Sequence, residues 1–302
     1  MFDVLVRAGC FISIIIAGYL LRKFGFFKEG DFSVLSRIVL KITLPAAFIS
    51  NFAGKEIDPS MLFVALLAFG MGVLYMIIGY LINIHKGKEE QAFGLLNLPG
   101  YNIGNFTLPF VQSFVGPIGV ITTSIFDVGN AFVCLGGAFG VASSLKGEGK
   151  FSFKRILKAL SRSVAFLTCV TMVTLGLLKI SIPSPIVSLA EIVGGANAFL
   201  AMLMIGVGFK LSGDKSQIGT IVKMLSIRYG IAFVFAGLVY YFLSMEFEAK
   251  LAIMILAFSP IGSAVPGFTE ELKGDVGLSS AINSISIICS IVFIVSILMI
   301  ML

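Results

Sequence analysis

Two short stretches of this chain place proline, glycine and small polar residues inside otherwise apolar sequence. The first is NLPGYNIGNFTLP, residues 97–109, and the second is SPIGSAVPG, residues 259–267. From Gly104 further glycines follow after twelve and fifteen residues, and the same two intervals recur from Gly262. Proline removes a backbone donor and glycine lowers the cost of non-helical angles, so each stretch is predicted to interrupt a helix. The freed backbone groups could then bind a polar ligand.

Within these stretches, some residues are suited to contact a ligand and others to break the helix. The predicted ligand contacts are Asn102, Gly104, Asn105, Pro260, Gly262 and Ser263. The predicted helix breakers are Pro99, Gly100, Pro109 and Pro266. If the interrupted helices cross, half-helix N-termini would face one point, which suits an anion. The alternative is a pair of kinked helices without a site. Two further amides in apolar sequence, Asn197 and Asn283, are candidate ligand contacts or helix-to-helix hydrogen bonds.

Three charged residues also lie in apolar stretches, where a charge is costly and needs a partner, a proton or a ligand. Asp127 stands ten residues into the stretch 117–145, about 15 Å along a helix. Arg228 and Lys41 could each pair with Asp127 or attract an anionic substrate. We predict that these three residues serve coupling to an ion or charge pairing, and a purely structural ion pair is the alternative.

The elements that must position these residues are membrane-spanning helices. Of the 302 residues 58% are hydrophobic and 13% are charged, whereas soluble domains are about 45–50% apolar. A helix needs roughly 20 residues to cross the hydrocarbon. We predict an all-α polytopic membrane protein with ten spans: 2–21, 34–53, 61–82, 91–115, 117–145, 155–180, 184–209, 218–243, 249–271 and 277–302.

The basic residues between these spans predict the orientation. Fourteen follow the odd-numbered spans: Arg22, Lys23, Lys28, Lys86, Lys88, Lys146, Lys150, Lys154, Arg155, Lys158, Arg162, Lys210, Lys215 and Lys273. The opposite side holds Arg7, Lys55, Lys179 and Lys250. By the positive-inside bias, the odd-numbered loops face the cytoplasm and both termini face outward. The net charge of +6 therefore indicates membrane topology and not nucleic-acid binding.

Five spans in each half make the second half inverted relative to the first. We predict one repeat at residues 1–145, a cytoplasmic linker at 146–153 and a second repeat at 154–302. Around the linker, Phe153, Ile156, Leu157 and Leu160 are spaced as in a basic amphipathic helix, which could lie on the membrane surface. The simpler interpretation, which we favour, is that they begin the sixth span.

The chain resembles the auxin efflux carrier family, which contains plant PIN auxin exporters and many bacterial and archaeal permeases. The resemblance covers essentially the whole length and rests on the order and spacing of several motifs. These are GYLLRKFGFF at 18–27, LSRIVLKITLPAAF at 35–48, NIGNFTLP at 102–109 with FVGPIG at 114–119, LAMLMIG at 200–206, and FSPIGSAVPGF at 258–268 with KGD at 273–275. Asn102, Pro109 and Pro260 match family positions, whereas Phe199 and Thr107 depart from the usual proline and glycine.

The resemblance implies ten helices as two inverted repeats, a scaffold part and a transport part, with helices 4 and 9 broken and crossed. It further implies elevator-type transport of a carboxylate-bearing organic anion, auxin-like or malonate-like, by a plasma-membrane protein that forms homodimers. Protons or sodium are the candidate coupling ions, and no cofactor is expected.

Other functional classes fit the sequence less well. The stretch 208–216 differs from a phosphate-binding loop because Asp214 separates glycine from lysine and no strand precedes it. An intramembrane aspartyl protease would need a second placed aspartate, and neither a metal-ligand cluster nor a disulfide framework is indicated. We therefore predict that the protein is not an enzyme. A channel or a membrane receptor for a small organic anion remains the alternative to a carrier.

Overall fold

The structure, a computed structural model, describes residues 2–28, 30–209 and 215–302, and every regular element in these ranges is a helix. Helix makes up 80% of the described residues. Within the described residues, seven helices are long and apolar enough to cross a membrane, or eight if a bent pair counts as one span. The protein is therefore an all-helical multi-pass membrane protein, as the hydropathy predicts. Its uninterrupted long helices are α1 (Phe2–Lys23), α4 (Phe63–Leu81), α13 (Ile218–Phe242) and α16 (Val276–Met301).

Other spans change their helical geometry midway. The second comprises α2 (Asp31–Ile38), a π-helical turn η1 (Val39–Thr43) and α3 (Leu44–Phe52). The fifth comprises α7 (Pro117–Phe132), the π-helical turn η4 (Val133–Gly137) and α8 (Ala138–Lys146). Gly136 in η4 has φ of 150°, which a residue with a Cβ rarely adopts. The seventh consists of α11 (Ser184–Gly195) and α12 (Asn197–Gly208).

Two spans are interrupted at the predicted places. Helix α5 (Lys88–Asn97) is separated by residues 98–102, the first break, from the π-helical turn η3 (Ile103–Thr107) and α6 (Leu108–Phe114). Helix α14 (Phe247–Ala257) is separated by residues 258–264, the second break, from α15 (Val265–Glu271). Pro99 and Gly100 lie in the first break and Pro260 in the second.

Both breaks end earlier than the sequence predicted. Pro266 lies in the first turn of α15, where a missing backbone N–H costs no hydrogen bond. Pro109 lies in the first turn of α6, directly after the π-helical turn η3. Both prolines therefore lie beyond the breaks and inside helices, and the prediction that they lie in the interruptions is corrected.

The predicted sixth span 155–180 is also corrected. Helix α9 (Phe153–Leu160) is bent by 80° from α10 (Val164–Leu177), so it is a separate helix and not the beginning of a straight span. The Ser163 hydroxyl accepts a hydrogen bond from Phe166 N at 3.3 Å and caps α10, which explains why the new helix begins there. Short 3₁₀ turns precede α4 (η2, Pro59–Leu62) and α13 (η5, Lys215–Gln217).

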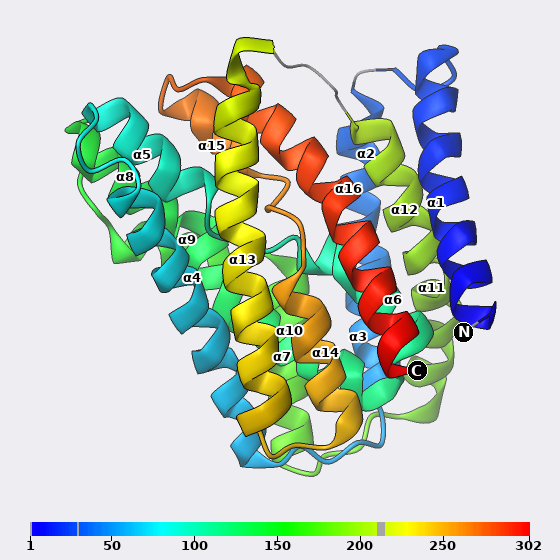
Figure 1. Cartoon of the computed structure of the whole chain (residues 1–302). Coiled ribbons are helices and arrows are strands. Elements are labelled where there is room, and N and C mark those ends of the chain that lie inside the picture. The colour runs from blue at the N-terminus through cyan, green and yellow to red at the C-terminus, as the bar shows by residue number, and fades with distance from the viewer. Residues whose placement is uncertain (1, 29, 210–214) are drawn as a thin grey trace.

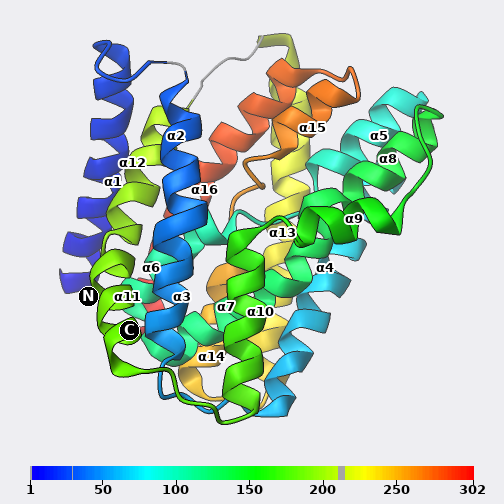
Figure 2. The ribbon, with the colours of Figure 1, turned by 180° about the vertical axis from the view of Figure 1, so that it is seen from behind.

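The helices gather into two groups around the breaks. In one group α1 lies along α12, and α3 packs against α10 and α11. In the other, α4 packs against α5 and α7, α5 against α8, and α13 against α14 and α16. Figure 1 shows both chain ends toward the lower side of the assembly, opposite the turn that follows α1. Figure 2 shows α9 lying across the bundle on the side nearest the viewer.

Candidate functional site

The two breaks contact each other directly. The backbone N–H of Asn102 donates to the Pro260 carbonyl oxygen at 2.9 Å, and the Thr107 and Ser259 hydroxyl oxygens lie 2.6 Å apart. All four residues are buried. Non-helical backbone at membrane depth is tolerated where it is buried in protein or lines a cavity. The mutual contact of the breaks meets this requirement.

The side chain of Arg228 in α13 forms hydrogen bonds with both breaks. Its guanidinium donates to the carbonyl oxygen of Leu98, to that of Gly100 at 2.8 Å, to that of Ser259 at 2.9 Å and, more weakly, to that of Pro260 at 3.5 Å. The side chain is fully buried. It therefore satisfies carbonyl groups that the interruptions release from helical hydrogen bonding.

Amide side chains hold each break to a neighbouring helix. Asn130 of α7 accepts from the backbone N of Tyr101 and donates to the Tyr101 carbonyl oxygen, both at 3.0 Å. Asn283 of α16 donates to the carbonyl oxygens of Ile261 at 2.9 Å and Gly262 at 3.2 Å. Such side chains take over hydrogen bonds that a continuous helix would make.

A cavity of about 330 Å³ lies where the first break and η3 face η1, α3, α7 and the start of α10. Its volume is in the range of small-molecule sites, roughly 300–1,000 Å³. Seven of the sequence-predicted residues line it: Lys41, Asn102, Gly104, Asn105, Asp127, Gly262 and Ser263. The π-helical turns η1, η3 and η4 each contribute to its wall. Such turns are frequent at functional sites.

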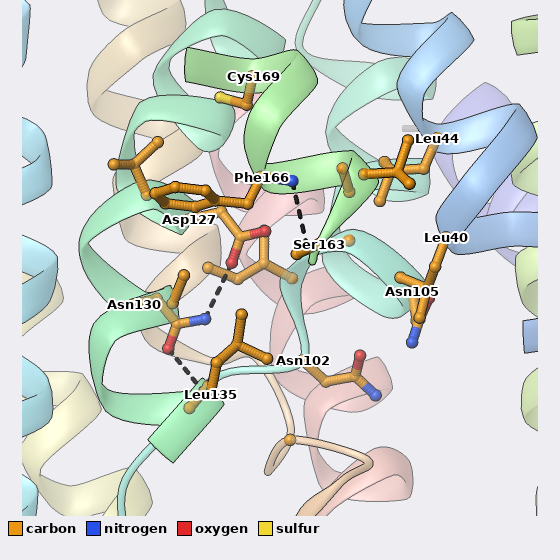
Figure 3. A pocket seen from close by; sticks show the side chains of 18 of the residues that line it. Leu40, Leu44, Asn102, Asn105, Asp127, Asn130, Leu135, Ser163, Phe166 and Cys169 are labelled. Atoms are coloured by element: carbon orange, nitrogen blue, oxygen red, sulfur yellow. Dashed lines mark hydrogen bonds between the residues drawn. The ribbon is translucent and has the colours of Figure 1, made fainter. Parts of the chain in front are cut away.

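The polar groups of the cavity are arranged on two sides. Figure 3 shows the Asp127 carboxylate beside Asn130, and the Asn102 and Asn105 side chains away from that pair. Asn130 donates to Asp127 Oδ1 at 2.9 Å. The Asn105 Oδ1 atom is buried without a hydrogen-bond partner among the described residues. An ideal Cβ built on Gly104 would lie 3.9 Å from Asp127 Oδ2, so η3 approaches the carboxylate closely at a residue without a side chain.

The formal charge of the cavity lining is positive. Lys41 and Arg162 are its two cations and Asp127 is its one carboxylate, which gives +1 when all three are ionised. Lys41 and Arg162 are exposed, whereas Asn102 and Asn105 are buried. Within the described residues, neither Lys41 nor Arg228 forms an ion pair with Asp127. The expectation that one of them pairs with this carboxylate is therefore corrected, because Asn130 is its hydrogen-bond partner and Arg228 is bound to carbonyl groups.

The remaining predicted residues lie outside this cavity. Asn283 and Pro266 line a second cavity of about 230 Å³, which shares Asn102 and Ser263 with the first. Asn197 is fully buried, accepts from Thr43 Oγ1 at 2.9 Å and donates to Gln112 at 3.5 Å. Its contacts are thus with neighbouring helices. The loop compared with a phosphate-binding loop includes residues 210–214, which lie outside the described ranges.

Among the cavity residues that sequence reasoning missed are Asn130 and Arg162. Asn130 stands three residues after Asp127, a spacing at which helical side chains meet, so the pair could have been found in the sequence. Arg162 was counted only as a loop charge, and the bend between α9 and α10 brings it to the cavity. No sequence signal indicated that bend strongly.

The first break and most of the cavity lie in the half of the chain that a known family also covers. Residues 10–159 match the family model described as membrane transport protein. The match includes η1 with Lys41, the first break, Asp127 and Asn130. It indicates a membrane transporter. No match to a curated protein was found.

Proposed function

We propose that this protein is a carrier for a small organic anion, in particular a carboxylate, which binds where the two breaks meet. The observation that carries the proposal is the shared cavity: elements from both interrupted helices line it beside buried amides. Interrupted helices that meet within the bilayer are the usual substrate sites of secondary transporters. The family match of residues 10–159 supports transport as the activity.

The chemistry of the lining favours an anion. The Asn102 and Asn105 amides and the Ser263 hydroxyl can donate hydrogen bonds to carboxylate oxygens, and all three residues line the cavity. Lys41 and Arg162 add a positive field at its exposed side. A carboxylate near these groups would exchange its hydration for charge-assisted hydrogen bonds.

The fold supports an alternating-access mechanism of the elevator type. Seven continuous spans, the bent pair α9–α10 and the two interrupted spans would give ten crossings, in two inverted repeats at residues 1–145 and 154–302. We propose that α1, α2–α3, α10 and α11–α12 form the scaffold, because they pack mainly on one another. The other helices carry the breaks and would move as the transport part.

The cellular arrangement belongs to the same proposal. We place the protein in the plasma membrane with both termini outside and with the linker at 146–153 in the cytoplasm, since the basic loops follow the odd-numbered spans. Asp127 would couple transport to an ion, with a proton as the simplest choice for a carboxylate. A homodimer would fit the scaffold role of the first group.

The proposal is tested with purified protein in liposomes. A panel of small carboxylates is screened by thermal shift, and the hits are used in uptake and counterflow measurements. A carrier gives saturable uptake that an unlabelled substrate on the opposite side accelerates. A channel gives flux without counterflow, and a receptor binds without flux. Either result would contradict the carrier.

Asn102→Ala tests the site itself. Because the Asn102 side chain reaches the cavity while its backbone N–H holds Pro260, the variant should keep the fold and lose most uptake. The matched control is Asn51→Ala, whose amide binds within its own helix α3. If both variants take up substrate as wild type does, the cavity is not the transport site.

A further inference from the structure

The backbone oxygens released by both breaks converge on one side chain. Leu98 and Gly100 belong to the first break and Ser259 and Pro260 to the second, and their carbonyl oxygens all accept hydrogen bonds from Arg228. Carbonyl oxygens of unwound membrane helices are also the groups that coordinate coupling cations such as sodium in transporters with broken helices. In this chain the Arg228 guanidinium occupies the position where such a cation would bind the carbonyl oxygens.

The surroundings of Arg228 are built for a permanent cation. The side chain is fully buried, and among the described residues no carboxylate pairs with it. Its charge is compensated by the carbonyl dipoles and by the faces of Tyr75 and Tyr101, whose ring centroids lie 5.2 Å and 5.1 Å from its central carbon. The Tyr75 hydroxyl also donates to the Arg228 carbonyl oxygen at 3.0 Å. Both aromatic contacts are within the range of cation–π attraction.

The guanidinium also has a shape that a metal ion lacks. One terminal nitrogen, Nη2, donates to Gly100 in the first break and to Ser259 and Pro260 in the second, while Nη1 donates to Leu98. This planar fork of donors fixes two backbone segments relative to each other. A lysine ammonium is a single point of charge and could not reproduce the arrangement.

We propose that Arg228 is the resident cation of the contact between the breaks, and that this contact neither needs nor binds sodium. A sodium ion could use these four oxygens only by displacing the guanidinium. The inference rests on the proposed function in one respect, because it predicts that transport is not coupled to sodium through the breaks. Arg228 is thus a positioning residue for the substrate site.

The first experiment does not depend on transport. Thermal unfolding of the full-length protein in detergent is measured in sodium, potassium, choline and guanidinium chlorides at equal, non-denaturing concentration. Wild type should unfold at the same midpoint in sodium and choline. Arg228→Ala should unfold at a lower midpoint in choline, and guanidinium or sodium should raise it selectively. Lys223→Ala is the matched control, because Lys223 is an exposed cation on the same helix that donates to the Ile82 carbonyl oxygen.

Several outcomes of the unfolding measurements would contradict the proposal. A wild-type midpoint that rises in sodium relative to choline would overturn the proposal, as would Arg228→Ala with wild-type stability. If Arg228→Ala is destabilised and no cation raises its unfolding midpoint, Arg228 contributes only packing, and the proposal is also overturned. If this variant does not fold, Arg228→Lys and the wild-type comparison still decide, since a Lys variant as stable as wild type contradicts the need for the fork.

The second experiment uses liposomes and a substrate identified by the carrier screen. Wild-type uptake should be unchanged when choline replaces sodium on both sides of the membrane. Uptake that requires sodium would overturn the inference and leave the carrier proposal intact. If no anion is transported at all, the proposed function fails, and the unfolding measurements still test the role of Arg228.

Discussion

Replacing Asn130 with alanine should loosen the first break by an amount that the structure lets us work out. The Asn130 amide exchanges two hydrogen bonds with the Tyr101 backbone at 3.0 Å and donates to Asp127 at 2.9 Å. The two neutral bonds contribute roughly 1–2 kcal/mol together. The bond to the carboxylate adds about 1.5–3 kcal/mol when Asp127 is ionised. Because bonds that share one side chain are not additive, we expect roughly 2–4 kcal/mol of destabilisation.

The assay follows from the composition. The chain has no tryptophan and four cysteines, so unfolding is followed with a dye that fluoresces on reaction with thiols. Cys169 is buried and reports opening of the bundle, whereas Cys10 is exposed, so a Cys10→Ser background is used. In that background Asn130→Ala should unfold well below the control Asn51→Ala. Equal midpoints for these two variants would refute the argument that Asn130 holds the break.

Two further predictions concern the same region. Asp127→Asn keeps the size of the side chain but cannot carry a charge or exchange a proton, so uptake should fall and lose its pH dependence; an unchanged pH profile of uptake in liposomes would exclude coupling through Asp127. Gly129→Ala should destabilise by roughly 1–3 kcal/mol, because a Cβ there would overlap the Ala65 carbonyl oxygen. Gly70→Ala, with nothing within 4 Å, should be neutral or stabilising in the same thiol assay, and equal midpoints for both glycine variants would contradict the close packing of α4 on α7.

The sequence predicted the apolar spans and the two interruptions because both are local properties. Long apolar runs give spans, and Pro99 and Pro260 cannot be accommodated in a regular helix without loss of hydrogen bonds. Gly100 lowers the cost of non-helical backbone angles beside Pro99. The predicted gathering of Asn102, Gly262 and Ser263 at one place followed from equal spacing in the two halves. Their joint presence at one cavity is a geometric finding, and a role in binding substrate stays a prediction.

The features that escaped prediction depend on neighbours. The π-helical turn at Val39–Thr43 contains neither proline nor glycine. Pro45 follows it in the first turn of α3, as Pro109 follows η3, and a proline inside a helix removes a backbone donor. That signal marks a disturbed helix without specifying a π-helical turn. The bend before α10 depends on whether the Ser163 hydroxyl caps a new helix, which serine permits without requiring. Arg228 was expected either to pair with Asp127 or to attract an anionic substrate, since charges in a bilayer need partners. Carbonyl groups released by the two breaks meet the same need, and only the assembled structure shows that they lie within its reach.

The π-helical turn in the second span determines which neighbouring helices the two halves of that span face. Such a turn holds one residue more than an α-helical turn, and each residue of an α-helix advances by about 100°. Side chains after the turn are therefore rotated by about that angle relative to those before it. Accordingly α2 faces α12, whereas α3 faces α7, α10 and α11. One membrane crossing thereby packs against two different sets of neighbouring helices. Deleting or inserting one residue in this span would rotate one half away from its neighbours, although the hydropathy of the span would hardly change.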